Sequence, residues 1–345
     1  MKNISIESEI PPITNKAKKN SGEKYYPDAN RFLQDAVFVP AHAYSKLKEL
    51  ALEEPWSLGG KNNDAVLKSY FKYTFFKAIL DKKYKLSADS QAFVINTGLV
   101  GEVAYDPIYA VFVRNPQPKK QPLALLGFFV GGNRLEPTLW GFGKNYDKSY
   151  FPEEPERIDY LEESNTIDVR KLKQLSLGNN HIIVDNFSRF PLEFILKGLP
   201  GELEAKVKEL HSKLKTLYKK DEMRKSLTDD LRELMKTNSA WVNEMNYLLT
   251  RSIDRAIARV EWNRATAIPT YYPTNDVLTF LLPLAFQPQS EHECFDLALA
   301  VSYGGHGSVD ATYKAYTVFT LEMAFNNARL VNRPASDWLR PEVIS

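Results

Sequence analysis

The chain has 345 residues, enough for one large domain or two of ordinary size. Hydrophobic residues make up 43% of it, so a sizeable core is expected, and a net charge of +2 is too small for a polybasic nucleic-acid binder. The single cysteine, Cys294, excludes an internal disulfide and favours a cytoplasmic location. The first residues resemble no signal peptide, and no apolar run approaches the ~18 residues of a membrane span.

The beginning of the chain differs in composition from the rest. Residues 1–28 are polar and are predicted to form a flexible tail. Its basic run, Lys16–Lys19, is interpreted as solvated, with a nucleic-acid arm as the alternative. Residues 29–345 are predicted to form a single domain that begins with two helices, over Arg31–Glu53 and Asp64–Leu80, because apolar residues recur there at helical spacing.

Apolar runs bounded by turn residues predict strands in the next part of the chain. The runs Gln91–Val100, Ile108–Arg114 and Pro122–Val130 are expected to pair as an antiparallel meander. Two shorter runs, Ile167–Leu172 and His181–Asn186, are also read as strands.

Residues 201–236 stand apart because they are highly charged and carry a heptad pattern. Their apolar residues step by 4, 3, 4 and 3 positions, as in a coiled-coil seam: Leu203, Val207, Leu210, Leu214 and Leu217. The pattern fits either one helical insertion or a hairpin with a break near Lys219–Asp221. We expect a projecting helical hairpin that is peripheral to function, that a short linker can replace without loss of folding, and that offers a surface to a protein partner.

The last third of the chain combines a long helix with buried strands. Ala240–Asn263 has one continuous apolar face, and Asp276–Phe286 and Cys294–Tyr303 read as strands. From Tyr313 a strand passes into a helix that Pro334 stops. The predicted fold class is therefore α+β, with a mostly antiparallel mixed sheet, packed helices and a coiled-coil-like hairpin.

Motifs of the common catalytic classes are missing. The five histidines are scattered, and the carboxylates that could bind magnesium fall into no motif: Asp185, Asp254, Asp296 and Glu322. There is no nucleophile elbow, no phosphate-binding loop and no dinucleotide fingerprint. No cofactor is predicted, a divalent metal has no motif to support it, and no catalytic residue is assigned.

Arginine placement suggests an anion site. Arg251, Arg255 and Arg259 form a row along the long helix, which is more often a solvated face. If Arg189 and Arg329 converge on the row, the arginines would form an anion site of phosphate size, because each guanidinium group can donate two hydrogen bonds to phosphate oxygens.

Other polar residues stand where a plain scaffold would have apolar ones. The backbone of Asn96-Thr97-Gly98 could supply N–H donors to an anion. Tyr271 and Tyr272 could stack a base, or pack at a rim. Thr317 and the neighbouring residues Asn326 and Asn327 either brace the C-terminal helix against the sheet or face a ligand.

The stretch from Tyr313 to Leu339 resembles the C-terminal signature of an uncharacterised bacterial family, domain of unknown function 3825. Ala315, Glu322 and Phe325 depart from its usual Gly, Asp and Tyr, and Phe325 leaves no tyrosine hydroxyl there for catalysis. The matching residues are Tyr313, Thr317, Thr320, Met323, Ala324, Asn326, Asn327, Ala328, Arg329, Pro334, Trp338 and Leu339.

The resemblance extends from Arg31 to Leu339, except for the heptad segment. It implies an association with RNA, because such domains accompany cold-shock and PIN-type RNA modules, and it implies no particular reaction. The further matches are Tyr70, Thr74, Phe75, Asn96, Thr97, Gly98, Leu99, Tyr109, Asp185, Asn186, Arg189, Phe190, Pro191, Arg255, Arg259, Asn263, Pro269, Tyr271, Tyr272, Leu282, Pro283, Leu284, Asp296, Leu297, Ala298 and Leu299.

Together these features predict a cytoplasmic protein of RNA metabolism that binds RNA or a nucleotide, with processing of a phosphate ester as a further option. The alternative is a non-enzymatic structural or protein-interaction module in an RNA-related or defence pathway. Convergence of Arg189, Arg255 and Arg329 on one cleft would favour binding, and burial with carboxylate partners would favour bracing. The candidate ligand-binding residues are Asn96, Thr97, Gly98, Arg189, Arg255, Arg259, Tyr271, Tyr272, Thr317, Asn326 and Arg329.

Overall fold

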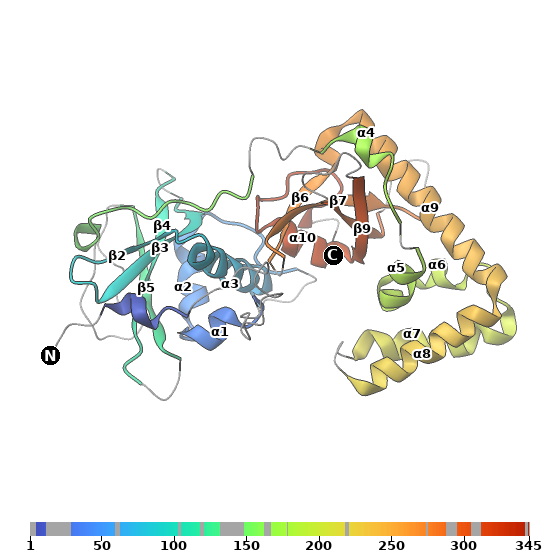
Figure 1. Ribbon diagram of the computed structural model, residues 1–345, viewed down its shortest axis with the longest axis horizontal. Helices are drawn as coiled ribbons and strands as arrows, with labels where there is room; N and C mark the ends of the chain where they lie inside the picture. Colours follow the sequence, from blue (N-terminus) through green and yellow to red (C-terminus); the bar gives the residue numbers. More distant parts are fainter. Residues whose placement is uncertain are drawn as a thin grey trace. The chain divides into compact units, whose positions relative to one another are not determined.

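The computed structural model groups the chain into two compact units (Figure 1). Unit 1 comprises Met1–Tyr160 and Tyr272–Asp276, and unit 2 comprises Leu161–Tyr271 and Val277–Ser345. The single domain over residues 29–345 stays a prediction. The structure describes residues 5–11, 29–58, 63–102, 105–117, 121–131, 148–161, 167–177, 179–217, 221–273, 275–287, 295–304, 312–341 and 344.

Unit 1 is built on a five-stranded sheet of order β1-β5-β4-β3-β2. Strand β1 pairs with β5 in parallel and the other neighbours are antiparallel, so the predicted meander is confirmed. The elements are η1 (Ile6–Glu9), α1 (Phe32–Ala36), β1 (Val37–Phe38), α2 (Ala43–Leu50), α3 (Ala65–Leu80), β2 (Tyr84–Leu86), β3 (Ala92–Val100), β4 (Pro107–Arg114), β5 (Leu123–Val130) and η3 (Lys148–Tyr150).

Helix α3 covers the sheet through aromatic packing. Phe71 lies against Phe128 with ring centroids 6.0 Å apart, and Phe75 lies 5.0 Å from Phe112. This helix was predicted correctly, but the helix predicted over Arg31–Glu53 is wrong in its middle. It divides into α1 and α2 around strand β1, because Pro40 follows the strand and cannot donate a helical hydrogen bond.

The first described residues dock onto the sheet of unit 1. Ile6 is fully buried, and its N–H donates to the Ser90 carbonyl at 2.9 Å. The Tyr84 hydroxyl donates to Glu7 at 2.9 Å, and Arg114 donates to the Ser5 carbonyl at 2.9 Å. This part therefore differs from the predicted flexible tail, because one apolar side chain is enough to anchor it, while Lys16–Lys19 lies outside the described residues.

We expect Ile6→Ala to lower the free energy of unfolding by about 2–5 kcal/mol, as truncation of a buried isoleucine does. The loss should be smaller for Ile10→Ala, because Ile10 is only half-buried. Urea denaturation of both variants measures the difference. If Ile6→Ala lowered the free energy of unfolding as little as Ile10→Ala, the N-terminal segment would not be docked.

Unit 2 is built on an antiparallel four-stranded sheet of order β6-β7-β8-β9. The predicted strands over Asp276–Phe286 and Cys294–Tyr303 correspond to β7 and β8, although Cys294 itself lies outside the described residues. The elements are α4 (Val169–Leu172), α5 (Asn179–Asp185), η4 (Phe187–Arg189), α6 (Leu192–Leu196), η5 (Gly201–Leu203), α7 (Glu204–Thr216), α8 (Glu222–Thr237), α9 (Ser239–Trp262), η6 (Arg264–Thr266), β6 (Ile268–Tyr272), β7 (Val277–Leu284), β8 (Leu297–Gly304), β9 (Thr312–Phe319) and α10 (Leu321–Ala328).

The two short strands predicted over Ile167–Leu172 and His181–Asn186 are wrong, because both segments are helical. At α4 the Asp168 carboxylate caps the helix by accepting from the Arg170 N–H at 2.9 Å. At α5 the Asn186 side chain donates to the Ile182 carbonyl at 2.9 Å. These local hydrogen bonds, together with burial of Ile182, outweigh the β-branched composition.

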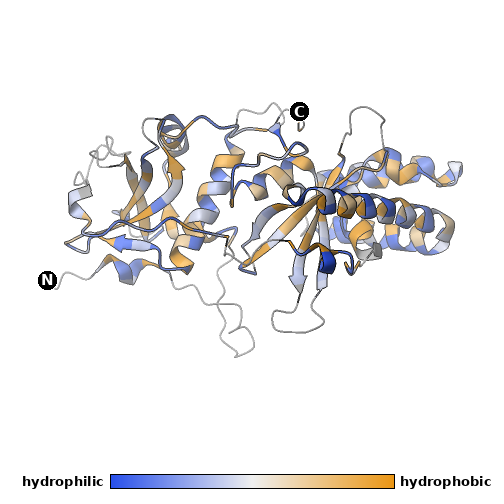
Figure 2. Cartoon of the chain, turned by 90° about the horizontal axis from the view of Figure 1, so that it is seen from above, coloured by the Kyte–Doolittle hydropathy of each residue, from blue (hydrophilic) through white to orange (hydrophobic). Residues whose placement is uncertain are grey.

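The predicted helical hairpin is confirmed as α7 and α8. Asp221 begins α8 by accepting from the Met223 N–H at 3.0 Å. Hydrophobic and hydrophilic residues alternate around these helices and around α9 (Figure 2). Their buried side chains join one core with Phe187 and Trp241, so the packing argues against a replaceable segment: Val207, Leu210, Leu214, Leu231, Leu234 and Met235.

The C-terminal strand and helix follow the predicted order. Strand β9 passes into α10 at Thr320, whose hydroxyl accepts from the Met323 N–H at 3.3 Å. The helix ends at Ala328, before the predicted stop at Pro334. Among the described helices, none combines the length and apolar character that crossing a bilayer requires.

Candidate functional site

Several predicted residues of unit 2 meet at one end of its sheet. Strand pairing places Leu284 opposite Leu297, and Ala298 opposite Phe319. The end of β7, the start of β8 and the end of β9 therefore lie side by side, about 4.8 Å apart from strand to strand. We call residues 284–286, 295–298 and 317–320 the strand-end region.

Arg189 contacts the strand-end region at β9. Its Nη1 donates to the Thr317 hydroxyl at 3.1 Å and to the Val318 carbonyl, and its guanidinium carbon lies 5.6 Å from the centre of the Phe319 ring. The Thr317 hydroxyl in turn donates to the buried amide oxygen of Asn186 at 2.8 Å. The structure thus brings together Arg189 and Thr317, which the sequence proposed separately.

A second arginine, Arg224 of α8, lies near Arg189. Its Nη1 donates to the carbonyls of Leu214 and, at 3.0 Å, Leu217, and its Nη2 donates to the Ser188 hydroxyl at 3.5 Å. Burial lowers the pKa of Arg189, and the positive charge of Arg224 lowers it further. The two guanidinium groups are therefore close enough to repel each other.

The charges of this arginine pair, Arg189 and Arg224, are not neutralised within the described part of the chain. Every hydrogen bond that the two side chains make there goes to a carbonyl or a hydroxyl, and none goes to a carboxylate. The Nε groups of both residues and Nη2 of Arg189 make no hydrogen bond to the described residues. Both side chains are half-buried, so these donors remain accessible to an anion.

Two arginines of the predicted row reach the same strand-end region. Arg255 donates to the Ala285 carbonyl, just past β7, at 2.7 Å. The guanidinium carbon of Arg259 lies 5.2 Å from the centre of the Phe295 ring, just before β8. Arg251 is exposed. Arginines therefore stand at the ends of three neighbouring strands.

Asn96, Thr97 and Gly98 belong to unit 1, where they lie in an irregular part of β3. The Gly98 N–H donates to the Asn96 side chain at 2.9 Å, and the Leu99 N–H donates to the Thr97 hydroxyl at 3.2 Å. Thr97 also donates to the Ile108 carbonyl at 2.7 Å. The N–H donors of Gly98 and Leu99 are thus used inside the fold.

The remaining candidates differ in exposure. Tyr271 is buried, which fits packing, whereas Tyr272 is 46% exposed and its ring is open to stacking. Asn326 has a buried side-chain oxygen without a hydrogen-bond partner among the described residues. Arg329 is only 6% exposed, which favours the bracing interpretation for this residue.

Carboxylates and histidines do not assemble into a metal site in the described residues, where no group of three or more such ligands occurs. Asp185 pairs with Arg232 at 3.6 Å, and Asp254 and Glu322 are exposed. His292 and His306 lie outside the part of the chain that the structure describes.

Arg224 is the residue that sequence reasoning missed. It lies in the charged hairpin, where arginine and lysine are common, and 35 positions separate it from Arg189. No spacing rule connects the two, so only the fold of the hairpin against η4 reveals the pair. Nothing in the sequence around Arg224 distinguishes it from the other basic residues of the hairpin.

The family model described as Domain of unknown function (DUF3825) matches residues 47–338, which is most of the chain. The chain therefore belongs to this family. No curated protein and no solved structure matches it.

Proposed function

We propose that this protein binds RNA or a nucleotide, and that Arg189 and Arg224 hold a phosphate group of the ligand. The observation that carries the proposal is that two half-buried arginines meet at η4, where Arg224 donates to Ser188 next to Arg189, and that neither has a carboxylate partner in the described residues. Holding like charges together costs free energy. A phosphate bound between them offsets that cost by accepting charge-assisted hydrogen bonds from both.

The surroundings of the arginine pair suit a phosphate rather than a carboxylate. Two planar forks match the several oxygens of a phosphate, and the hydroxyls of Ser188 and Thr317 lie within the same network. Arg255 and Arg259 add positive charge at the neighbouring strand ends.

RNA is favoured over other phosphate compounds by the family resemblance in the sequence. The resemblance in the sequence implies a bacterial family that accompanies RNA modules, and a cytoplasmic location agrees with the single cysteine. The proposal concerns binding, and we assign no reaction to the arginine pair.

Burial of Arg329 supports the second candidate, a structural module in which polar residues brace the fold. In that case Arg189 would only tie η4 to β9 through Thr317 and Val318. Bracing predicts loss of stability on substitution and no RNA binding.

RNA binding is expected to weaken as salt rises, because phosphate contacts release counterions. Two phosphate contacts to a single strand give a slope of about −1.4 in log affinity against log salt, or roughly a sevenfold loss between 50 and 200 mM. Fluorescence anisotropy with a labelled single-stranded RNA measures the slope, and ATP as competitor tests the nucleotide. An isotherm that does not change with salt would argue against phosphate recognition.

A further inference from the structure

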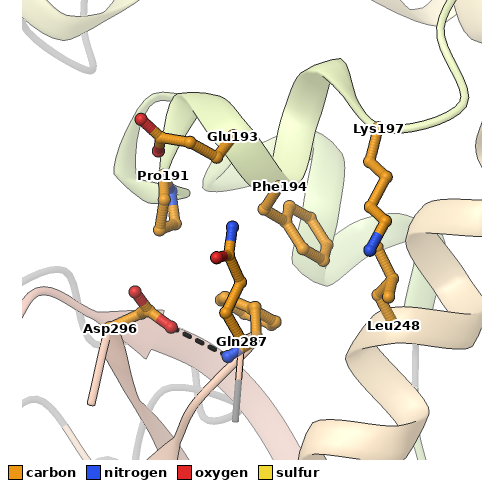
Figure 3. A pocket seen from close by; sticks show the side chains of 8 residues that line it. Pro191, Glu193, Phe194, Lys197, Leu248, Gln287 and Asp296 are labelled. Atoms are coloured by element: carbon orange, nitrogen blue, oxygen red, sulfur yellow. Dashed lines mark hydrogen bonds between the residues drawn. The ribbon is translucent and has the colours of Figure 1, made fainter. Parts of the chain in front are cut away.

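A small pocket of ≈ 210 Å³ opens in unit 2 between α6, α9 and the segments at the ends of β7 and β8 (Figure 3). Its aromatic lining is formed by Phe194 and Phe286, whose ring centroids are 4.3 Å apart. Asp296 and Glu193 lie on one side of it in this view, and Lys197 lies on the other. The complete lining is Pro191, Glu193, Phe194, Lys197, Leu248, Phe286, Gln287 and Asp296.

Asp296 is held in a defined orientation at this pocket. Its Oδ2 accepts from the Phe286 N–H at 2.8 Å, while Oδ1 makes no hydrogen bond to the described part of the chain. Burial raises the pKa of Asp296, the hydrogen bond from the Phe286 N–H lowers it in part, and the negative charge of Glu193 adds a smaller increase. The carboxylate is thus partly desolvated beside a second negative charge.

No cation of the described chain neutralises these two carboxylates. Neither Asp296 nor Glu193 has an ion-pair partner there, and Lys197 is exposed and forms no ion pair with the described residues. A positively charged group in the pocket would remove the repulsion between the carboxylates. The apolar lining would accept the hydrocarbon stem of the same ligand.

From this geometry we propose that the pocket binds a small organic cation, an alkyl chain that ends in an ammonium or guanidinium group. The charged end donates to Asp296 and Glu193, and the alkyl chain packs against Phe194 and Leu248. The pocket volume limits the ligand to a few heavy atoms. This pocket is proposed to bind a cation, whereas the arginine pair is proposed to bind an anion. Either proposal can therefore fail without the other.

The test uses n-butylammonium and n-butylguanidinium as probes and saturation-transfer NMR on the full chain as the measurement. Butanol and butyrate have the same alkyl chain without the positive charge. We expect both cations to bind and the neutral and anionic analogues not to bind. The two cationic arms show which charged end the pocket prefers. Absence of cation binding, or equal binding of butanol, would overturn the proposal.

Two variants assign the binding to the carboxylates. Asp296→Asn keeps an oxygen that can accept from Phe286 and should weaken cation binding at least tenfold. Asp254→Asn makes the same change at an exposed position of α9 outside the pocket and should leave binding within twofold. If Asp296→Asn does not fold, Glu193→Gln on the exposed rim carries the test. Unchanged affinity in both pocket variants would overturn the assignment.

Discussion

Gly98→Ala should destabilise the protein by about 3–5 kcal/mol, because it combines backbone strain with the loss of a buried hydrogen bond. Gly98 has a φ of +74°, which an L side chain rarely adopts. A Cβ built there would lie 2.4 Å from the Tyr70 hydroxyl oxygen. Tyr70 is buried and donates to the Thr97 carbonyl at 2.9 Å, so it cannot move without losing that bond.

A second substitution separates the clash with the Tyr70 hydroxyl from the backbone strain at Gly98. Tyr70→Phe removes the clashing oxygen, and the next ring atom lies 3.7 Å from the built Cβ, an ordinary contact. The double variant should therefore lose less stability than the sum of the two single variants. Gly201→Ala, with nothing within 4 Å of its built Cβ, is the control and should stay within about 0.5 kcal/mol of wild type. The unfolding free energies are measured by urea denaturation. A loss for Gly98→Ala as small as that for Gly201→Ala would refute this account.

Leu231→Ala is expected to lower the free energy of unfolding by about 2–5 kcal/mol, the range for truncating a fully buried leucine. Leu231 lies on α8, within the core that also contains Leu214 of α7 and Trp241 of α9. Trp241 is fixed there by donating its indole N–H to the Ile195 carbonyl at 2.6 Å. The hairpin thus covers hydrophobic surface that unit 2 cannot leave exposed.

Met223→Ala is the matched control on the same helix, because Met223 is 61% exposed. Its effect should stay near zero while that of Leu231→Ala is large. If both substitutions were equally mild, the hairpin would be the replaceable insertion that its charge pattern suggests. Thermal melts followed by circular dichroism, with urea titrations to obtain free energies, decide between the two outcomes.

Long periodic segments could be predicted from the sequence, and short ones could not. The heptad steps from Leu203 to Leu217 and the apolar face of α9 each extend over several turns, so the helical period is unambiguous. In α5 the run Ile182–Val184 is too short to show a period, and its β-branched residues favour a strand by composition. Tertiary packing and the Asn186 side chain decide that case.

The candidate site could be predicted only in part, for a related reason. Thr317 stood out because a polar residue interrupted an apolar element, and Arg189 because it could join the other arginines at an anion site. The structure places the two side chains in contact. Arg329 stood out in the same way but is buried, because the exposure of a helix face depends on what packs against it. Arg224 gave no signal, since its role arises from a contact between distant segments.

The most direct test of the proposed phosphate site compares two arginine variants that lose the same charge. RNA affinity is measured by fluorescence anisotropy at fixed low salt for wild type, Arg224→Gln and Arg251→Gln, each first checked by its melting temperature. Arg224→Gln should weaken binding roughly 10- to 100-fold, as expected for a lost charge-assisted hydrogen bond of about 1.5–3 kcal/mol. Arg251→Gln, at an exposed position of α9, should change affinity less than about threefold. Equal losses in the two variants, or no binding by the folded wild type, would contradict a phosphate site at Arg189 and Arg224.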